Sequence, residues 1–193
     1  ASQTSHDNNH IMDNFLYALF EGGKVQEMHP DMYLFHVGDP VRFVHLIEDG
    51  AVHLERSQFN VQGMCFQRGR AGDVLAEASI YAHAYHCDAR IVEPARLRRL
   101  PIKRLIKRLE TEPGLSRAWQ ARLARTVQTT RLLAEIRGLK TVEQRFYAWL
   151  DQNEALPTKG HWQNLAQELA VSPEAFYREL ARRRSNKASL RPD

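Results

Sequence analysis

The feature that most constrains the fold is an abrupt change of pattern at Pro101. Before this residue, short runs rich in β-branched and aromatic residues end in Gly, Asp or Pro, which is typical of strands joined by tight turns. After it, apolar residues recur every three or four positions, which is typical of amphipathic helices. The sequence therefore predicts an α+β protein with a β-rich front part and a helical rear part.

The front part is predicted to form a sandwich or barrel of short strands. Asp49-Gly50 lies between two β-type runs, and this pair predicts a hairpin turn because glycine tolerates the positive φ that such turns need. Gly69 and Gly72 are expected to break the later strands. The strands are expected at residues 33–37, 43–47, 51–55, 61–67 and 88–100, after a short helix at residues 11–23.

The rear part is predicted to contain a helix after Pro101 and a longer one at 115–136. The longer helix spans about six turns and carries an apolar stripe. Such a stripe packs either on its own domain or against a second copy of the chain. Another helix is expected at 141–150, with Thr141 as its N-cap and Gln144 completing a capping box. If the stripe pairs with a second copy of the chain, the interface residues are Trp119, Leu123, Val127, Thr130 and Leu133.

The segment 161–183 is the most informative about function. Its pattern predicts a short helix, a turn and a second helix, in which Ser172 is the N-cap and Pro173 takes the first helical position. This is the arrangement of a helix-turn-helix, whose second helix enters the major groove of DNA. The alternative is a plain helical hairpin. The residues expected to point inward are Leu165, Ala166, Leu169, Val171, Phe176 and Leu180.

Helical geometry places the polar residues of the second helix on its outer face. Arginine can donate two hydrogen bonds to the edge of a guanine, and glutamate can accept a hydrogen bond from the amino group of a cytosine. Further basic residues can bind the phosphates. Phosphate contacts are expected from Arg183, Arg184 and Lys187. The candidate DNA-binding residues are Ser172, Glu174, Tyr177, Arg178 and Arg182.

The charge distribution follows the same division of the chain. Residues 1–95 contain 6 Lys and Arg against 13 Asp and Glu, whereas residues 96–137 contain 12 against 3. An acidic front and a basic rear are typical of separate sensor and nucleic-acid-binding parts, although a solvated helix face produces such a run equally well. Two cysteines and no apolar run of about 20 residues favour a cytoplasmic protein outside the membrane.

Five stretches between about residue 24 and residue 184 carry a family resemblance: Phe35–Pro40, Val44–Gly50, Arg70–Asp73, Glu77–Ser79 and Ser172–Arg178. In these stretches the chain resembles the Crp/Fnr superfamily of bacterial transcription regulators. The resemblance implies a homodimer that binds double-stranded DNA at a roughly palindromic site, with RNA polymerase as a candidate partner.

The family's domain plan implies four segments. They are a tail and short helix at 1–23, a β jelly-roll effector domain at 24–112, a long dimerisation helix at 113–137, and a helix-turn-helix domain at 138–193. Because residues 185–193 are too few for the family's β-hairpin wing, a short or missing wing is expected.

The effector segment departs from the nucleotide-binding members of the family. Glu77 matches their ribose-binding glutamate, but Ala76 stands where glycine is usual. If Cys87 points inward, Tyr85 and His86 occupy the positions of the phosphate-binding Arg-Ser pair. Without that arginine a buried phosphate lacks its bidentate partner, so binding of cyclic AMP in the usual manner is not expected. The candidate effector pocket consists of Glu77, Ser79, Tyr85 and His86.

The helix-turn-helix departs from the family at two positions. Ala170 replaces the usual turn glycine, which would cost about 1 kcal/mol if its φ is positive. Pro173 replaces an arginine that is frequent there, so the preferred DNA site is expected to differ from that of the best-known members.

Metal or haem binding and catalysis are the other kinds of function that the residue types raise. His83, His86 and Cys87 are of the types that ligate metals or haem, but their spacing matches no tight zinc pattern, and no metal or cofactor is expected. No catalytic motif is recognisable, so an enzyme is not expected. The alternative function is a small-ligand sensor module of the same fold that acts through a protein partner.

Overall fold

The computed structural model describes residues 15–58, 61–153 and 155–188. The chain divides into two compact units, residues 1–120 and 121–193, and the boundary lies within one long helix. Within the described ranges, no helix is both long and apolar enough to cross a membrane.

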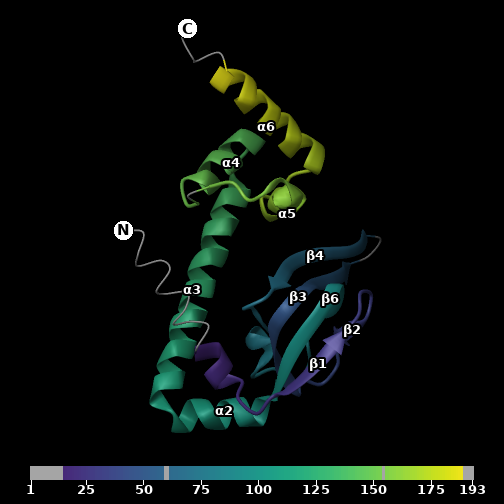
Figure 1. Ribbon diagram of the computed structural model, residues 1–193, viewed down its shortest axis with the longest axis vertical. Helices are drawn as coiled ribbons and strands as arrows, with labels where there is room; N and C mark the ends of the chain where they lie inside the picture. The colour runs from purple at the N-terminus through teal and green to yellow at the C-terminus, as the bar shows by residue number, and fades with distance from the viewer. Residues whose placement is uncertain (1–14, 59–60, 154, 189–193) are drawn as a thin grey trace. The chain divides into compact units, whose positions relative to one another are not determined.

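The first unit is built on one antiparallel sheet (Figure 1). Its main path runs β1-β6-β3-β4, while β2 pairs with β6 and β5 pairs with β3. The strands are β1 (Lys24–Met28), β2 (Tyr33–Phe35), β3 (Phe43–Gln58), β4 (Val61–Arg70), β5 (Val74–Leu75) and β6 (Asp88–Pro101).

The two long strands, β3 and β6, organise this sheet into a roll. They pair with each other along most of their length, from Phe43 opposite Pro101 to Glu55 opposite Asp88. On its other edge, each long strand pairs with two shorter strands in turn. Strand β6 pairs first with β2 and then with β1, and strand β3 pairs first with β5 and then with β4. The roll encloses an apolar core that includes Phe35, Ile47 and Leu97. The predicted β-rich front domain is thus confirmed.

The predicted hairpin at Asp49-Gly50 is wrong. The chain continues through this pair as one 16-residue strand, β3, and the register against β6 shifts on both sides of Asp49. Gly50 has φ +86°, and a Cβ at this position would meet the backbone of Pro94 and Ala95. The Asp-Gly pair therefore forms a bulge opposite a proline, which has no N–H to donate to a regular ladder.

The predicted break at Gly69 is also wrong, because this residue lies inside β4. It is buried, and a Cβ there would lie 2.7 Å from Cδ1 of Ile47 and 2.9 Å from Cδ2 of Leu75. Gly69 is therefore small because the strand packs closely on the core. Gly72, by contrast, does lie in the turn between β4 and β5.

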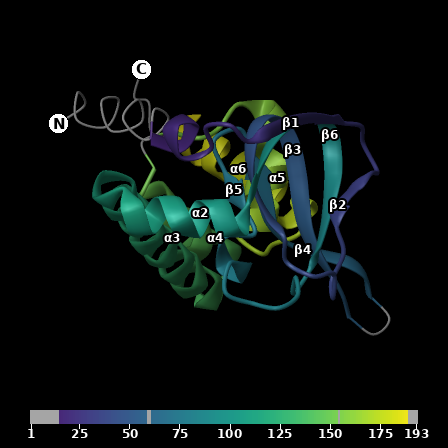
Figure 2. The same ribbon diagram turned by 90° about the horizontal axis from the view of Figure 1, so that it is seen from below.

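Two helices complete the first unit beside the sheet. Residues 15–19 are helical, and residues 11–14 of the predicted N-terminal helix lie outside the described ranges. Helix α2 (Ile102–Thr111) follows β6 directly and appears along its length in Figure 2. Arg108 of α2 donates to the carbonyl of Leu19 at 3.0 Å and pairs with Glu112, so α2 is tied to the end of the N-terminal helix.

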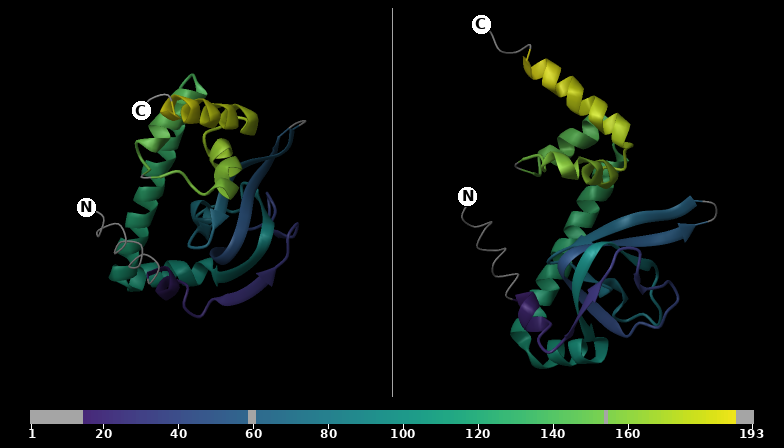
Figure 3. Two further views of the ribbon diagram at one scale, coloured as in Figure 1. Left: turned by 45° about the horizontal axis from the view of Figure 1, so that its top comes forward. Right: turned by 45° about the vertical axis from the view of Figure 1, so that its right-hand side comes forward.

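The described part of the second unit contains helices joined by turns and loops, and no strand (Figure 3). Helix α3 (Pro113–Gly138) enters it and is followed by α4 (Val142–Leu150), α5 (Trp162–Glu168) and α6 (Pro173–Ala188). The capping box of Thr141 and Gln144 at the start of α4 is confirmed. The core of the second unit contains Ile136, Phe146 and Trp162. It also contains the residues that the pattern predicted to point inward: Leu165, Ala166, Leu169, Phe176 and Leu180, with Val171 packed against them.

Candidate functional site

The α5-turn-α6 segment has the local geometry that its sequence predicts. The Ser172 hydroxyl accepts from the amide of Ala175 at 3.2 Å and caps α6, which begins at Pro173. Phe176 is fully buried and meets the ring of Phe146 edge-on at 5.3 Å. The inner face of α6 is therefore fixed on α4, and its outer face remains exposed.

The turn between α5 and α6 contains a strained alanine. Ala170 has φ +53°, a conformation that suits glycine better than alanine. Its amide donates to the carbonyl of Gln167, and the amide of Val171 donates to that of Ala166 at 2.9 Å. These two bonds form a Schellman motif, which requires the left-handed residue at this place.

Three of the candidate DNA-binding residues lie together on the outer face of α6. Glu174 and Arg178 are exposed one turn apart, and Tyr177 is 38% exposed with its ring 6.1 Å from that of Trp162. Hydrogen bonds from its own backbone amide and from Ser172, with the nearby Arg178 cation, hold the pKa of Glu174 below its usual value. Glu174 is therefore ionised at neutral pH and available as an acceptor.

Two other basic residues of α6 are engaged within the unit. Arg182 forms ion pairs with Glu179 of its own helix, at 2.9 Å, and with Glu143 of α4, and these carboxylates raise its pKa. The guanidinium of Arg183 lies 4.5 Å from the ring centre of Tyr147 and 4.9 Å from that of Phe146. A phosphate contact by either residue would compete with these internal partners. Residues 185–188, where a short or missing wing is expected, continue α6.

The apolar stripe of α3 changes character along the helix. Trp119 is only 3% exposed within the single chain, whereas Val127 is 47% exposed. Leu123 and Leu133 are half-buried, and Thr130 is exposed. The Thr130 hydroxyl donates to the carbonyl of Thr126 at 2.8 Å, so its polar group is satisfied inside the helix. The middle of α3 therefore presents unpartnered apolar surface.

The candidate effector pocket is a small cavity of about 30 Å³ inside the roll. Pockets that hold drug-sized ligands measure roughly 300 Å³ or more, so this cavity, at about 30 Å³, is much smaller than a nucleotide needs. Ser79 is buried, and its hydroxyl lies 3.1 Å from Nδ1 of His86. No Arg or Lys of the described residues lines the cavity, whose walls are Phe35, Leu54, Gln67, Ala76, Glu77, Ala78, Ser79, His86 and Cys87.

Tyr85 is packed into the core and does not line this cavity. Its ring stacks on Phe35 with centres 3.9 Å apart, and its hydroxyl donates to the carbonyl of Phe43 at 3.0 Å. Cys87, directly before β6, is buried, and burial raises the pKa of its thiol to about 11. Arg90 cannot replace the missing phosphate-binding arginine because it pairs with Glu55 at 2.7 Å.

The sequence did not indicate that Gln67 lines the cavity. It also did not indicate that the backbone conformation at position 76 is the reason why glycine is usual there. Gln67 reaches the cavity because β4 pairs it with Leu54, a register that no local motif announces. Ala76 has φ +68°, so the position itself favours glycine. In the described part of the chain, no group of three or more His, Cys, Asp and Glu residues is arranged to hold a metal.

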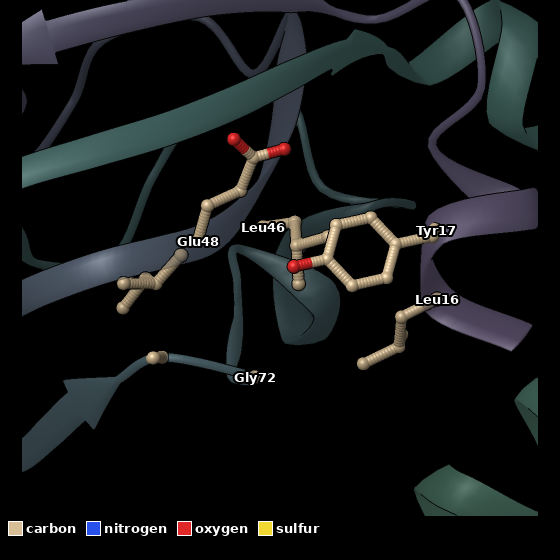
Figure 4. Close-up of a pocket in the computed structure, with 7 residues that line it drawn as sticks. Leu16, Tyr17, Leu46, Glu48 and Gly72 are labelled. Carbon is tan, nitrogen blue, oxygen red and sulfur yellow. The ribbon is translucent and has the colours of Figure 1, made fainter. Parts of the chain in front are cut away.

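A second and larger pocket, of about 190 Å³, lies between the N-terminal helix and the roll (Figure 4). The ring of Tyr17 lies beside Leu46 in this view, and Leu16 stands on the same helix. The Glu48 carboxylate accepts from Arg96 at 2.9 Å and from Arg98 at 2.5 Å, so its charge is already paired. The pocket therefore combines apolar side chains with a carboxylate whose charge is already paired.

Part of the first unit is similar to a known protein family. Residues 25–112 match the family model of the cyclic nucleotide-binding domain. No curated protein matches the chain in sequence.

Among solved structures, the chain is similar to FixK2 from Bradyrhizobium japonicum, with 16% identity, a TM-score of 0.68, and coverage of 86% of each chain. The c-di-GMP-responsive global regulator CLP from Xanthomonas campestris is 17% identical with a TM-score of 0.62, over 91% of this chain and 93% of that one. The sensor domain of the transcriptional regulator DNR from Pseudomonas aeruginosa is 20% identical with a TM-score of 0.52, over 74% and 99%. These similarities establish the fold.

Proposed function

We propose that the chain is a sequence-specific DNA-binding regulator, because residues 25–112 match the family model of the cyclic nucleotide-binding domain and the chain has the fold of Crp/Fnr-type transcription regulators. In this proposal it acts in the cytoplasm as a homodimer on a roughly palindromic site, with RNA polymerase as a candidate partner, and it is not an enzyme.

The outer face of α6 is the observation that carries this proposal. Ser172 and the Schellman turn fix where the helix begins, and Phe176 fixes which side faces the core. The exposed Glu174, Tyr177 and Arg178 then form one face that fits a major groove. Arg178 would fork onto a guanine, and Glu174 would accept from a cytosine amine.

The effector of this regulator is proposed not to be cyclic AMP bound in the usual manner. The cavity beside Glu77 and Ser79 is roughly a tenth of the size that a small-molecule pocket needs. Tyr85 and His86 stand where the family places its phosphate-binding pair, and Tyr85 is held in the core by Phe35. Calorimetry of the purified chain with cyclic AMP should give no saturable heat; micromolar binding would overturn this part of the proposal.

Selection of bound DNA from a random pool tests the main proposal. The full chain should enrich an inverted repeat whose half-sites lie about one helical turn apart. Arg178→Ala should lower the affinity for the selected site about 10- to 100-fold and relax the base preference at one position of each half-site. Arg117→Ala removes the same charge from the exposed surface of α3 and serves as the control.

The outcome that contradicts DNA reading is equal binding to selected and random DNA, with Arg178→Ala no different from the Arg117→Ala control. The helical unit would then be a module for another protein, acting with the same effector domain. A pull-down with the wild-type chain and Arg178→Ala would next identify what the outer face of α6 contacts.

A further inference from the structure

The carbonyl groups at the end of α5 are satisfied in an unusual way. The last carbonyls of a helix have no partner inside the helix and need donors from elsewhere. Here the carbonyls of Leu165, Ala166 and Gln167 receive backbone amides of the turn, at 2.9 to 3.0 Å. The next three carbonyls, of residues 168–170, receive arginine side chains instead.

Two guanidinium groups supply these donors. Nε of Arg137, near the end of α3, donates to the carbonyl of Glu168 at 2.8 Å. Nη1 of Arg145, on α4, donates to the carbonyls of Leu169 and Ala170 at 3.2 and 2.9 Å. Positive charge at the C-terminal end of α5 is favourable for two reasons. The guanidinium groups donate to the free carbonyls, and they face the negative end of the helix dipole.

Arg145 also holds a second helix end. Its Nε donates to the carbonyl of Leu139, directly after α3, at 2.9 Å. One planar guanidinium therefore joins the end of α3 to the turn that precedes α6. A planar fork can bridge three carbonyls in fixed directions, whereas the point charge of a lysine cannot.

We propose that Arg145 is a positioning residue that couples the end of α3 to the helix-turn-helix, so that a movement at residue 139 is passed to the start of α6. Arg137 supports it by holding the carbonyl of Glu168, whose carboxylate accepts from the indole of Trp149 at 3.1 Å. The proposal rests on the proposed DNA-binding function and adds a route by which α3 sets the orientation of the DNA-reading helix. Arg145 acts through the turn and touches no base.

The variants Arg145→Gln, Arg145→Lys and Arg137→Gln test this coupling, with Arg117→Gln as a control of equal charge loss. Arg145→Gln should weaken binding to the selected DNA site about tenfold or more, because charge-assisted hydrogen bonds are lost. Binding to random DNA and the slope of log affinity against log salt should stay as in the wild type. Arg145→Lys should recover only part of the loss, since it restores charge without the fork.

Amide hydrogen exchange provides a readout that needs no DNA. Arg145→Gln should speed the exchange of the amides of residues 169–172 and 174–176 while leaving those in the middle of α4 protected, and Arg137→Gln should give a smaller effect at the same place. Arg117→Gln should change neither exchange nor binding. If Arg145→Gln does not fold, the Lys variant and Arg137→Gln carry the same comparison.

Three results would overturn the coupling. The first is a salt slope lower by about 0.9 in Arg145→Gln, which would make Arg145 a direct phosphate contact. The second is unchanged exchange in residues 169–176, and the third is an equal loss on selected and random DNA. If the wild-type chain binds no DNA, the proposed function fails, and the exchange experiment alone decides whether Arg145 holds the turn.

Discussion

At the scale of single residues, Ala170 shows a fold that retains local strain. The Schellman turn requires the positive φ of this residue, and in that conformation the alanine Cβ is sterically crowded. Ala170→Gly should therefore raise the free energy of unfolding by about 1 kcal/mol. Ala134→Gly makes the same chemical change at an exposed position inside α3, where it should lower stability by about 1 kcal/mol. Denaturant unfolding of both variants measures the two signs; destabilisation by Ala170→Gly would contradict the turn geometry.

His45 is the residue that should make stability depend on pH. Burial, and secondarily the Arg99 cation, lower its pKa from 6.5 to about 3, and its Nδ1 has no hydrogen-bond partner. The unfolded chain takes up a proton at this histidine below pH 6.5 and the folded chain does not. The free energy of unfolding therefore keeps its full contribution from His45 above pH 6.5. As the pH falls from 6.5 towards 3, the free energy of unfolding decreases by about 1.4 kcal/mol per pH unit.

The variant His45→Leu removes this titration. In acid, the slope of its unfolding free energy against pH should therefore be smaller by the contribution of about one proton. It should also gain stability at neutral pH, because the unpaired ring nitrogen is gone. The exposed His83 supplies the matched control, and His83→Gln should keep the wild-type pH dependence. Unfolding free energies measured between pH 7 and 4 decide the matter; parallel curves for wild type and His45→Leu would exclude His45 as the source.

At the scale of elements, helices were more predictable than strands. The long helix, the Thr141 capping box and the Ser172 cap each depend on residues close in sequence, and all were confirmed. The roll could be predicted as a class, but its register could not, because β3 and β6 pair residues about 35 to 60 positions apart. Asp49-Gly50 has the local signature of a hairpin, and only the distant Pro94 makes it a bulge. The size of the candidate effector cavity likewise could not be predicted, because Phe35 lines it and packs on the core residue Tyr85.

Two glycines with nearly equal φ test the explanation of this bulge. Gly50 has φ +86° and lies against Ala95, whereas Gly38 has φ +87° and open space around its missing Cβ. Gly38→Ala should cost about 1 kcal/mol for the backbone alone. Gly50→Ala adds a clash with Pro94 and Ala95 and should cost roughly 3 kcal/mol or more. Thermal unfolding of the two variants separates these contributions, and equal losses would mean that the close approach at Gly50 carries no cost.

At the scale of the whole molecule, the exposed apolar surface of α3 predicts that the working form has two copies of the chain. Val127 lies in the middle of the stripe and is 47% exposed, and the Thr130 hydroxyl is bonded within its own helix. A second α3 would bury both side chains without leaving a polar group unpaired. Val127→Glu should therefore shift the monomer–dimer equilibrium at least tenfold towards monomer in sedimentation, because a carboxylate would be buried in the seam.

Thr129→Glu adds the same charge two residues away, on the opposite side of the helix, and should leave the dimer intact. The consequence for DNA follows from the number of recognition helices. A monomer makes half of the phosphate contacts, so the slope of log affinity against log salt should fall by about half for Val127→Glu and stay unchanged for Thr129→Glu. A Val127→Glu chain that still sediments as a dimer and retains the full salt slope would show that the copies associate elsewhere than along α3.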